Sequence, residues 1–67
     1  MQYCEAIKKV RLMMCLTQTE FGKLFNVTFG TVNRWESGKH DPTMKIKRQL
    51  MPYFDKYGIK ELILKIV

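Results

Sequence analysis

The sequence predicts an all-α fold, a compact bundle of about five short helices. Apolar residues recur three and four positions apart along most of the chain, which is the spacing that gives a helix one apolar face. Threonine, asparagine and glycine, which start or stop helices, separate these repeats. The 67 residues leave room for a single domain, 1–67, near the lower limit at which a core holds without disulfides or metal.

The composition is that of a soluble globular protein. The apolar fraction is 46%, and no uninterrupted apolar run approaches the roughly 20 residues that a membrane span needs. The N-terminus also lacks the apolar segment of a signal peptide. We therefore expect the chain to stay in the cytoplasm.

The first helix is predicted over Glu5–Met14, with Ile7, Val10 and Met14 facing the core. Arg11 lies one step from that apolar face, at its rim. This helix also carries or adjoins the two cysteines.

Cys4 and Cys15 are eleven residues apart on what reads as one helix, which separates them by about 16 Å at 1.5 Å per residue. A disulfide needs Cα atoms within about 7 Å. His40 has no cysteine or second histidine near it to complete a zinc site. We expect free thiols, no metal and no cofactor.

The second helix is predicted to begin near Gln18. Thr17 and Glu20 form a capping box, in which each side chain satisfies a backbone N–H at the helix start. An apolar face follows, made of Phe21, Leu24 and Phe25, and we expect all of it to be buried. Gly22 is unfavourable inside a helix by about 1 kcal/mol relative to alanine. A close approach by the next helix would explain it.

A tight turn and a third helix come next. Asn26 suits the left-handed backbone of a helix end, and Val27 fills the turn with an apolar side chain. Thr28 can cap the third helix, which runs over about 28–36. Val32 and Trp35 point back to the second helix, and Gly38 terminates the third.

At these residues the chain resembles the Cro and phage-repressor type of helix-turn-helix regulator, also called the xenobiotic-response-element family. The resemblance spans about 7–42 and rests on Arg11, Leu16-Thr17-Gln18, Phe21-Gly22, Val27, Val32, Trp35-Glu36-Ser37-Gly38-Lys39 and Pro42. It implies a lambda-repressor-like DNA-binding domain with the helix-turn-helix at about 17–37. It also implies that Glu36 is the ion-pair partner of Arg11.

The chain departs from this pattern at three places. Asn26 stands at the turn position usually held by glycine, which the left-handed argument accommodates. Cys15 replaces the glycine that commonly ends the first helix, which leaves open a different end for that helix. Phe29 and Gly30 take outward positions that are often polar, so sequence preference cannot be copied from relatives.

A fourth helix is predicted after Thr43, with Ile46, Leu50 and Phe54 on one face. Pro52 interrupts this stripe, so we expect a kinked or broken helix that ends at Tyr57 with Gly58 as its cap. The last segment, 59–67, reads as a short amphipathic helix. Part of it would cover the core, and the surplus, including Ile63 and Ile66, could form a dimer contact.

Charge favours a polyanionic partner. The net charge is +6, and basic residues outnumber acidic ones between Arg34 and Arg48. This stretch contains Arg34, Lys39, Lys45, Lys47 and Arg48 against Glu36 and Asp41. An enzyme is not expected, because no nucleophile with a base, paired carboxylates or phosphate-binding loop can be assembled.

Two functions remain at this stage. The first is sequence-specific binding of a double-stranded DNA operator by a bacterial or phage transcriptional regulator, a repressor and homodimer. The second is an antitoxin-like or adaptor module, whose C-terminal helix holds a toxin or co-regulator. A basic face around the third helix would favour DNA, and a large exposed apolar patch would favour protein binding.

For DNA binding, the third helix enters the major groove while the second crosses the backbone. Gln18 would meet a phosphate, and Phe29 a thymine methyl. Thr31, Asn33 and Arg34 are candidates for phosphate or base edges, with Arg34 the strongest base contact. The full set of predicted DNA-binding residues is Gln18, Thr28, Phe29, Thr31, Asn33, Arg34 and Lys39.

Overall fold

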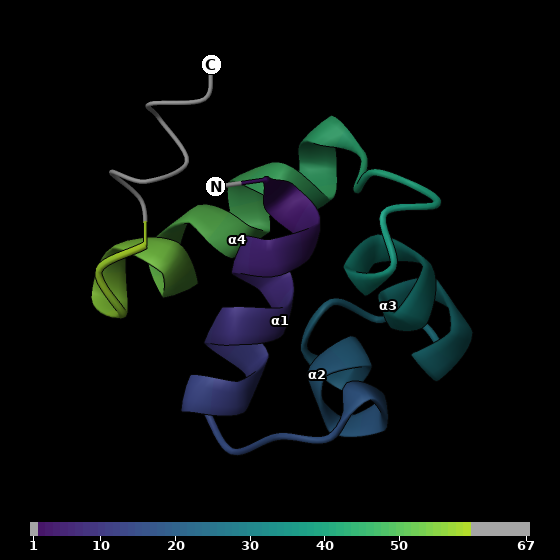
Figure 1. The fold of residues 1–67 in the computed structure, drawn as a ribbon, viewed down its shortest axis with the longest axis horizontal. Helices are drawn as coiled ribbons and strands as arrows, with labels where there is room; N and C mark the ends of the chain where they lie inside the picture. Colours follow the sequence, from purple (N-terminus) through teal and green to yellow (C-terminus); the bar gives the residue numbers. More distant parts are fainter. Residues whose placement is uncertain (1, 60–67) are drawn as a thin grey trace.

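The computed structural model describes residues 2–59, and these residues fold into four α-helices (Figure 1). The helices are α1 (Tyr3–Met13), α2 (Gln18–Leu24), α3 (Phe29–Glu36) and α4 (Met44–Lys56). The predicted all-α class is therefore confirmed. The fifth helix expected over 59–67 lies outside the described residues, apart from Ile59, which is buried.

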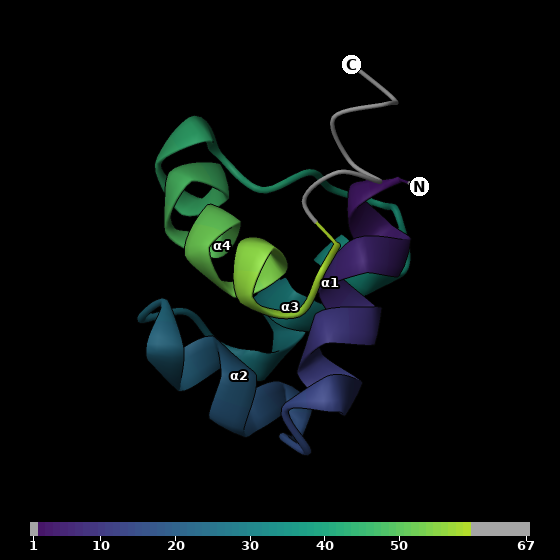
Figure 2. The ribbon, with the colours of Figure 1, turned by 90° about the vertical axis from the view of Figure 1, so that its left-hand side faces the viewer.

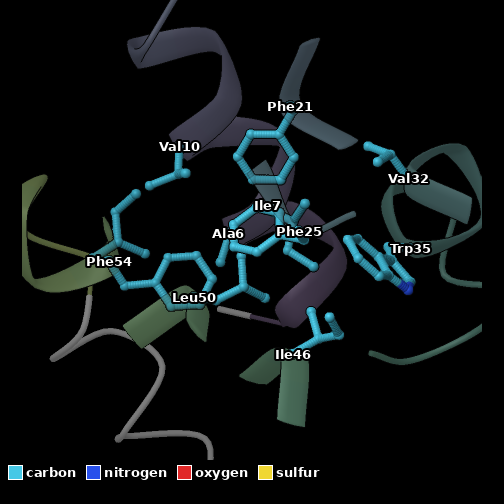
Figure 3. Packing of buried hydrophobic residues seen from close by; sticks show 11 residues of the cluster. Ala6, Ile7, Val10, Phe21, Phe25, Val32, Trp35, Ile46, Leu50 and Phe54 are labelled. Atoms are coloured by element: carbon cyan, nitrogen blue, oxygen red, sulfur yellow. The ribbon is translucent and has the colours of Figure 1, made fainter. Parts of the chain in front are cut away.

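The helices surround one apolar core. In Figures 1 and 2, two views 90° apart, α4 lies above α2, and α1 runs alongside both. Their apolar side chains point to a common centre (Figure 3). Residues that are completely buried include Ile7, Val10, Phe21, Val32, Leu50 and Phe54. Each such side chain contributes roughly 1.5–3 kcal/mol by leaving water, so this cluster is the main source of stability.

One predicted core residue, Leu24, is exposed over 45% of its surface. The buried face of α2 includes Gly22 beside Phe21, and Phe25 lies at its end. In a projection of 3.6 residues per turn, Gly22 and Leu24 lie on opposite sides of Phe21. Burial of Gly22 therefore turns Leu24 away from the core. The expectation that all three apolar residues of this helix are buried was therefore wrong for Leu24.

Helix α1 begins two residues earlier than predicted, because Tyr3 takes part in the packing. Its ring lies 6.1 Å from that of Phe54, and the Lys47 ammonium lies 4.6 Å from the Tyr3 ring centre. At the other end Cys15 adopts φ 59°, the left-handed conformation usual for glycine at that point. The Leu16 N–H then donates to the Arg11 carbonyl at 3.2 Å. The helix therefore ends as it would with glycine.

Helix α4 is continuous through Pro52, so the alternative of a broken helix was wrong. The Thr43 hydroxyl caps its start by accepting from the Ile46 N–H at 3.4 Å. Pro52 has no N–H to donate, so α4 lacks one backbone hydrogen bond at this point. The helix ends at Lys56, and Gly58 follows with φ 73°, as predicted for the cap. No helix within residues 2–59 combines the length and apolarity that crossing a membrane would require.

Candidate nucleic-acid interface

The capping box predicted at the start of α2 is present. The Thr17 hydroxyl accepts from the Glu20 N–H at 3.1 Å, and the Glu20 carboxylate accepts from the Thr17 N–H at 2.9 Å. This backbone hydrogen bond, with the hydroxyl contact, holds the pKa of Glu20 below its usual value. The box fixes where α2 begins, and thus the position of Gln18 as its first residue.

The turn between α2 and α3 packs directly on Gly22. Asn26 adopts φ 57°, as predicted for the helix end, and the Val27 N–H donates to the Gly22 carbonyl at 2.9 Å. A Cβ added to Gly22 would lie 2.6 Å from the Val27 carbonyl oxygen and 3.3 Å from a methyl group of Val32. The expected close approach is therefore present, mainly from the turn. It locks α2, the turn and α3 into one unit.

An ion pair joins α1 to the end of α3. The Arg11 Nε donates to Glu36 Oε2 at 2.7 Å, and Nη2 donates to Oε1 at 3.0 Å. The third nitrogen, Nη1, donates to the Leu16 carbonyl at 2.9 Å. The two side chains are only 12% and 5% exposed. The hydrogen bond to Glu36 raises the pKa of Arg11, so the guanidinium stays charged and holds three segments together.

Gln18, predicted to meet a phosphate, takes part in this network. Its amide nitrogen donates to Glu36 Oε1 at 3.2 Å. The side chain is half-buried, between the start of α2 and the end of α3. An amide nitrogen carries two protons, so one remains for a further acceptor.

The remaining predicted residues follow α3 along its outer side. Val32 and Trp35 turn inward and are buried, which places Asn33 and Arg34 outward, where both are exposed. Phe29 is 54% exposed at the N-terminal end. Thr28 caps the helix by accepting from the Thr31 N–H at 3.4 Å, and the two threonine hydroxyls lie 3.2 Å apart.

Lys39 is brought to the C-terminal end of α3 by a tightly bonded loop. The Arg34 carbonyl accepts from the Lys39 N–H at 3.1 Å, the His40 N–H at 3.3 Å and the Ser37 hydroxyl at 3.2 Å. Gly38 permits this turn with φ 77°. The backbone of Lys39 is thus held against that of Arg34, and both side chains are exposed.

The comparison with protein families decides the identity of this arrangement. A family model described as helix-turn-helix matches residues 7–50, which are 44 of the 67 residues. The chain belongs to the Cro and phage-repressor type helix-turn-helix family. Searches among curated proteins and among solved structures returned no match.

As a member of this helix-turn-helix family, the chain is a DNA-binding protein of the transcription-regulator class. Its ligand is double-stranded DNA. Among residues 2–59, no group of three or more histidine, cysteine, aspartate or glutamate side chains is placed to hold a metal ion. Cys4 and Cys15 are free thiols.

The helix-turn-helix surface also contains two residues that were not predicted. A polar recess of about 290 Å³ lies between α1, α2 and α3 and is lined by Lys8, Arg11, Gln18, Asn33, Glu36 and Ser37. Lys8 stands three residues before Arg11, and this spacing puts both on the same side of a helix. That spacing could have identified Lys8, whereas Ser37 gave no separate signal.

The basic residues of the stretch between Arg34 and Arg48 differ in their exposure. Lys39, Lys45 and Arg48 are exposed, as expected for groups that face a polyanion. Lys47 instead lies over the Tyr3 ring and is half-buried. Its charge stabilises the contact of α4 with α1 through a cation–π interaction.

Proposed function

We propose that this protein is a bacterial or phage regulator that binds a specific double-stranded DNA operator and represses transcription by occupying it. Helix α3 enters the major groove, and α2 crosses the phosphate backbone. The observation that carries the proposal is the division of α3 into two faces. Val32 and Trp35 are buried, while Phe29, Asn33 and Arg34 are exposed on a helix whose orientation Arg11 fixes.

The residues of this face have separate roles. Arg34 reads a base, because a guanidinium can donate two hydrogen bonds to guanine in the major groove. Asn33 and Thr31 face base edges or phosphates. Thr28 caps the start of α3 by accepting from the Thr31 N–H, at the end of the helix that meets the DNA. Phosphate contacts come from Lys39 and from the remaining amide proton of Gln18.

The antitoxin-like or adaptor alternative relied on the segment 59–67, most of which lies outside the described residues. In the described part, the exposed large apolar side chains are spread over four helices: Leu12, Met13, Leu24, Phe29 and Met44. This distribution favours DNA over a protein partner held by one apolar patch.

Selection of bound duplexes from a random-sequence pool tests the proposal. Wild-type protein should enrich one short motif, and binding to it should weaken as salt is raised, because cations such as Lys39 neutralise phosphates and displace counterions. Leu24→Ala, which changes an exposed side chain of α2, is the control and should select the same motif. A pool that stays random after repeated rounds would refute the proposal.

A further inference from the structure

Gly30 is a helical glycine that the protein itself does not require. It is the second residue of α3, and its φ lies outside the left-handed region that favours glycine. A Cβ added there would meet only the Thr28 hydroxyl oxygen, at 3.9 Å, which is ordinary van der Waals contact. Alanine would therefore fit, and it would favour the helix. Gly22, in contrast, is required by the fold, because a Cβ added there would lie 2.6 Å from the Val27 carbonyl oxygen.

Gly30 also lies at the centre of the outward face. In a projection of 3.6 residues per turn, it stands almost opposite the midpoint of the buried pair Val32 and Trp35. Asn33 and Arg34 flank it on the same side of α3. The missing side chain therefore leaves α3 open where a bound ligand would come closest.

The chemistry beside Gly30 is apolar. Phe29 precedes it and is 54% exposed, although burying an aromatic ring would be favourable. The nearest hydroxyl groups, on Thr28 and Thr31, lie within hydrogen-bond distance of each other at 3.2 Å. At its N-terminal end, the outward face of α3 thus presents the aromatic ring of Phe29 and, at Gly30, no side chain. The polar side chains of this face lie further along α3, at Asn33 and Arg34.

The C5 methyl group of thymine is the only alkyl group on the major-groove edges of the four base pairs. Most of the other groups there are hydrogen-bond donors or acceptors, and covering them with a ring would leave them unsatisfied. We propose that Phe29 and Gly30 together recognise a thymine methyl group, with Phe29 making the contact and Gly30 allowing α3 to approach closely enough. This inference rests on the proposed DNA binding and adds the group that is read.

Replacing thymine by deoxyuridine tests the contact, because the two bases pair alike and differ by one methyl group. The probe is the duplex selected by the wild-type protein, resynthesised with deoxyuridine at one thymine at a time. One of these changes should weaken wild-type binding about fourfold, the loss expected for one buried methyl group. Phe29→Ala should bind the two duplexes equally. The control, Leu24→Ala, should keep the difference.

Gly30→Ala tests the approach of α3. The protein should melt about 4–8 °C higher than wild type, because the helix gains alanine without a clash. Its affinity for the selected duplex should nevertheless fall at least about tenfold, since the new methyl group occupies the approach surface. A stabilised protein that binds poorly cannot be explained by misfolding.

Two results would overturn the inference: equal wild-type binding to every thymine and deoxyuridine pair, or unchanged affinity of Gly30→Ala. Failure of the proposed function would look different. In that case the wild-type protein would enrich no motif at all, so no selected duplex would be obtained and the comparison of thymine with deoxyuridine could not begin.

Discussion

Arg34 in the last turn of α3 and Lys39 in the loop after it are both exposed cations, yet we expect them to differ in what they recognise. Arg34→Ala should lose about 1–3 kcal/mol on the preferred site and relax the choice at one G·C pair. Lys39→Ala should weaken binding to all sequences alike and lower the salt slope by about one unit. Binding isotherms on the preferred site and on its single-base variants, at two salt concentrations, distinguish the two residues.

The assignment of Arg34 depends on base preference, not on affinity alone. If Arg34→Ala keeps the full preference and changes only the salt dependence, then Arg34 holds a phosphate. The Lys39 variant is the internal control. It also removes one exposed cation, from the loop whose backbone is hydrogen-bonded to the Arg34 carbonyl.

Gly22 should be intolerant of even one added carbon. In Gly22→Ala the new Cβ would lie 2.6 Å from the backbone oxygen of Val27, which cannot move without displacing the turn. We expect a loss of about 3 kcal/mol in the free energy of unfolding, measured by urea denaturation. Gly30→Ala serves as the matched substitution in a neighbouring helix. Similar effects of the two changes would contradict the role of close packing at Gly22.

At the scale of elements, the Arg11–Glu36 pair fixes α1 against the end of α3. Arg11→Met or Glu36→Gln alone should cost about 3–5 kcal/mol, because each leaves an unpaired, largely buried group. Exposed Lys9→Met on the same helix is the control for charge and should be nearly neutral. Thermal melts report the difference, and variants that melt within about two degrees of wild type would exclude a structural role for the pair.

The capping box of α2 should make the free energy of unfolding depend on pH. The pKa of Glu20 is lower in the folded protein than its ordinary value of 4.5, so the folded state favours the carboxylate. This contribution is complete above pH 4.5 and is lost as the pH falls through the lower, folded-state pKa. Melting temperatures between pH 7 and about pH 3 measure it.

Glu20→Gln isolates the charge, because glutamine can still accept from the Thr17 N–H. Wild type should melt higher than this variant at neutral pH, and the advantage should shrink as acid is added. A constant difference over the whole range would show that the charge of Glu20 has no part in the box.

The elements could be predicted from local chemistry where the signal was itself local. Thr17, Thr28 and Thr43 each begin a helix because a hydroxyl can satisfy a backbone N–H within three residues. Leu24 was misjudged because its burial depends on how α2 rotates against its neighbours, which is set by tertiary contacts at Gly22. The continuity of α4 through Pro52 likewise depends on packing of the helix as a whole.

The site was predictable in outline for the same reason. The spacing of three residues between Val32 and Trp35 identifies the inward face of α3, so the outward positions of Asn33 and Arg34 could be predicted from sequence. The hydrogen bond from Gln18 to Glu36 could not, because it joins residues eighteen apart through side chains. The same applies to the recess that brings Lys8 of α1 beside Asn33 of α3.

At the scale of the whole molecule, one copy is too small to read two successive turns of DNA. The described part measures 28 × 23 × 19 Å, whereas major grooves on one face of a duplex lie about 34–36 Å apart. We therefore propose a homodimer on a two-fold symmetric site. Sedimentation at micromolar concentration should show a dimer on DNA, and a monomer both with and without DNA would refute it.

Half-site spacing gives a sharper test of the dimer. Inserting five base pairs between the half-sites turns one of them to the opposite face, so binding to the two should lose its cooperativity. Ile63→Lys and Ile66→Lys, in the segment outside the described residues, should have the same effect if that segment joins the two copies. Leu24→Ala should leave cooperativity intact.

Because α3 packs on the core through one face only, the residues of its outward face can evolve independently of those that hold the fold. Val32 and Trp35 carry the packing, while Asn33 and Arg34 are exposed. Exchange of these two outward residues should therefore change the free energy of unfolding little. Most members of a combinatorial library at the two positions should fold, so new operator preferences are accessible there without prior stabilisation.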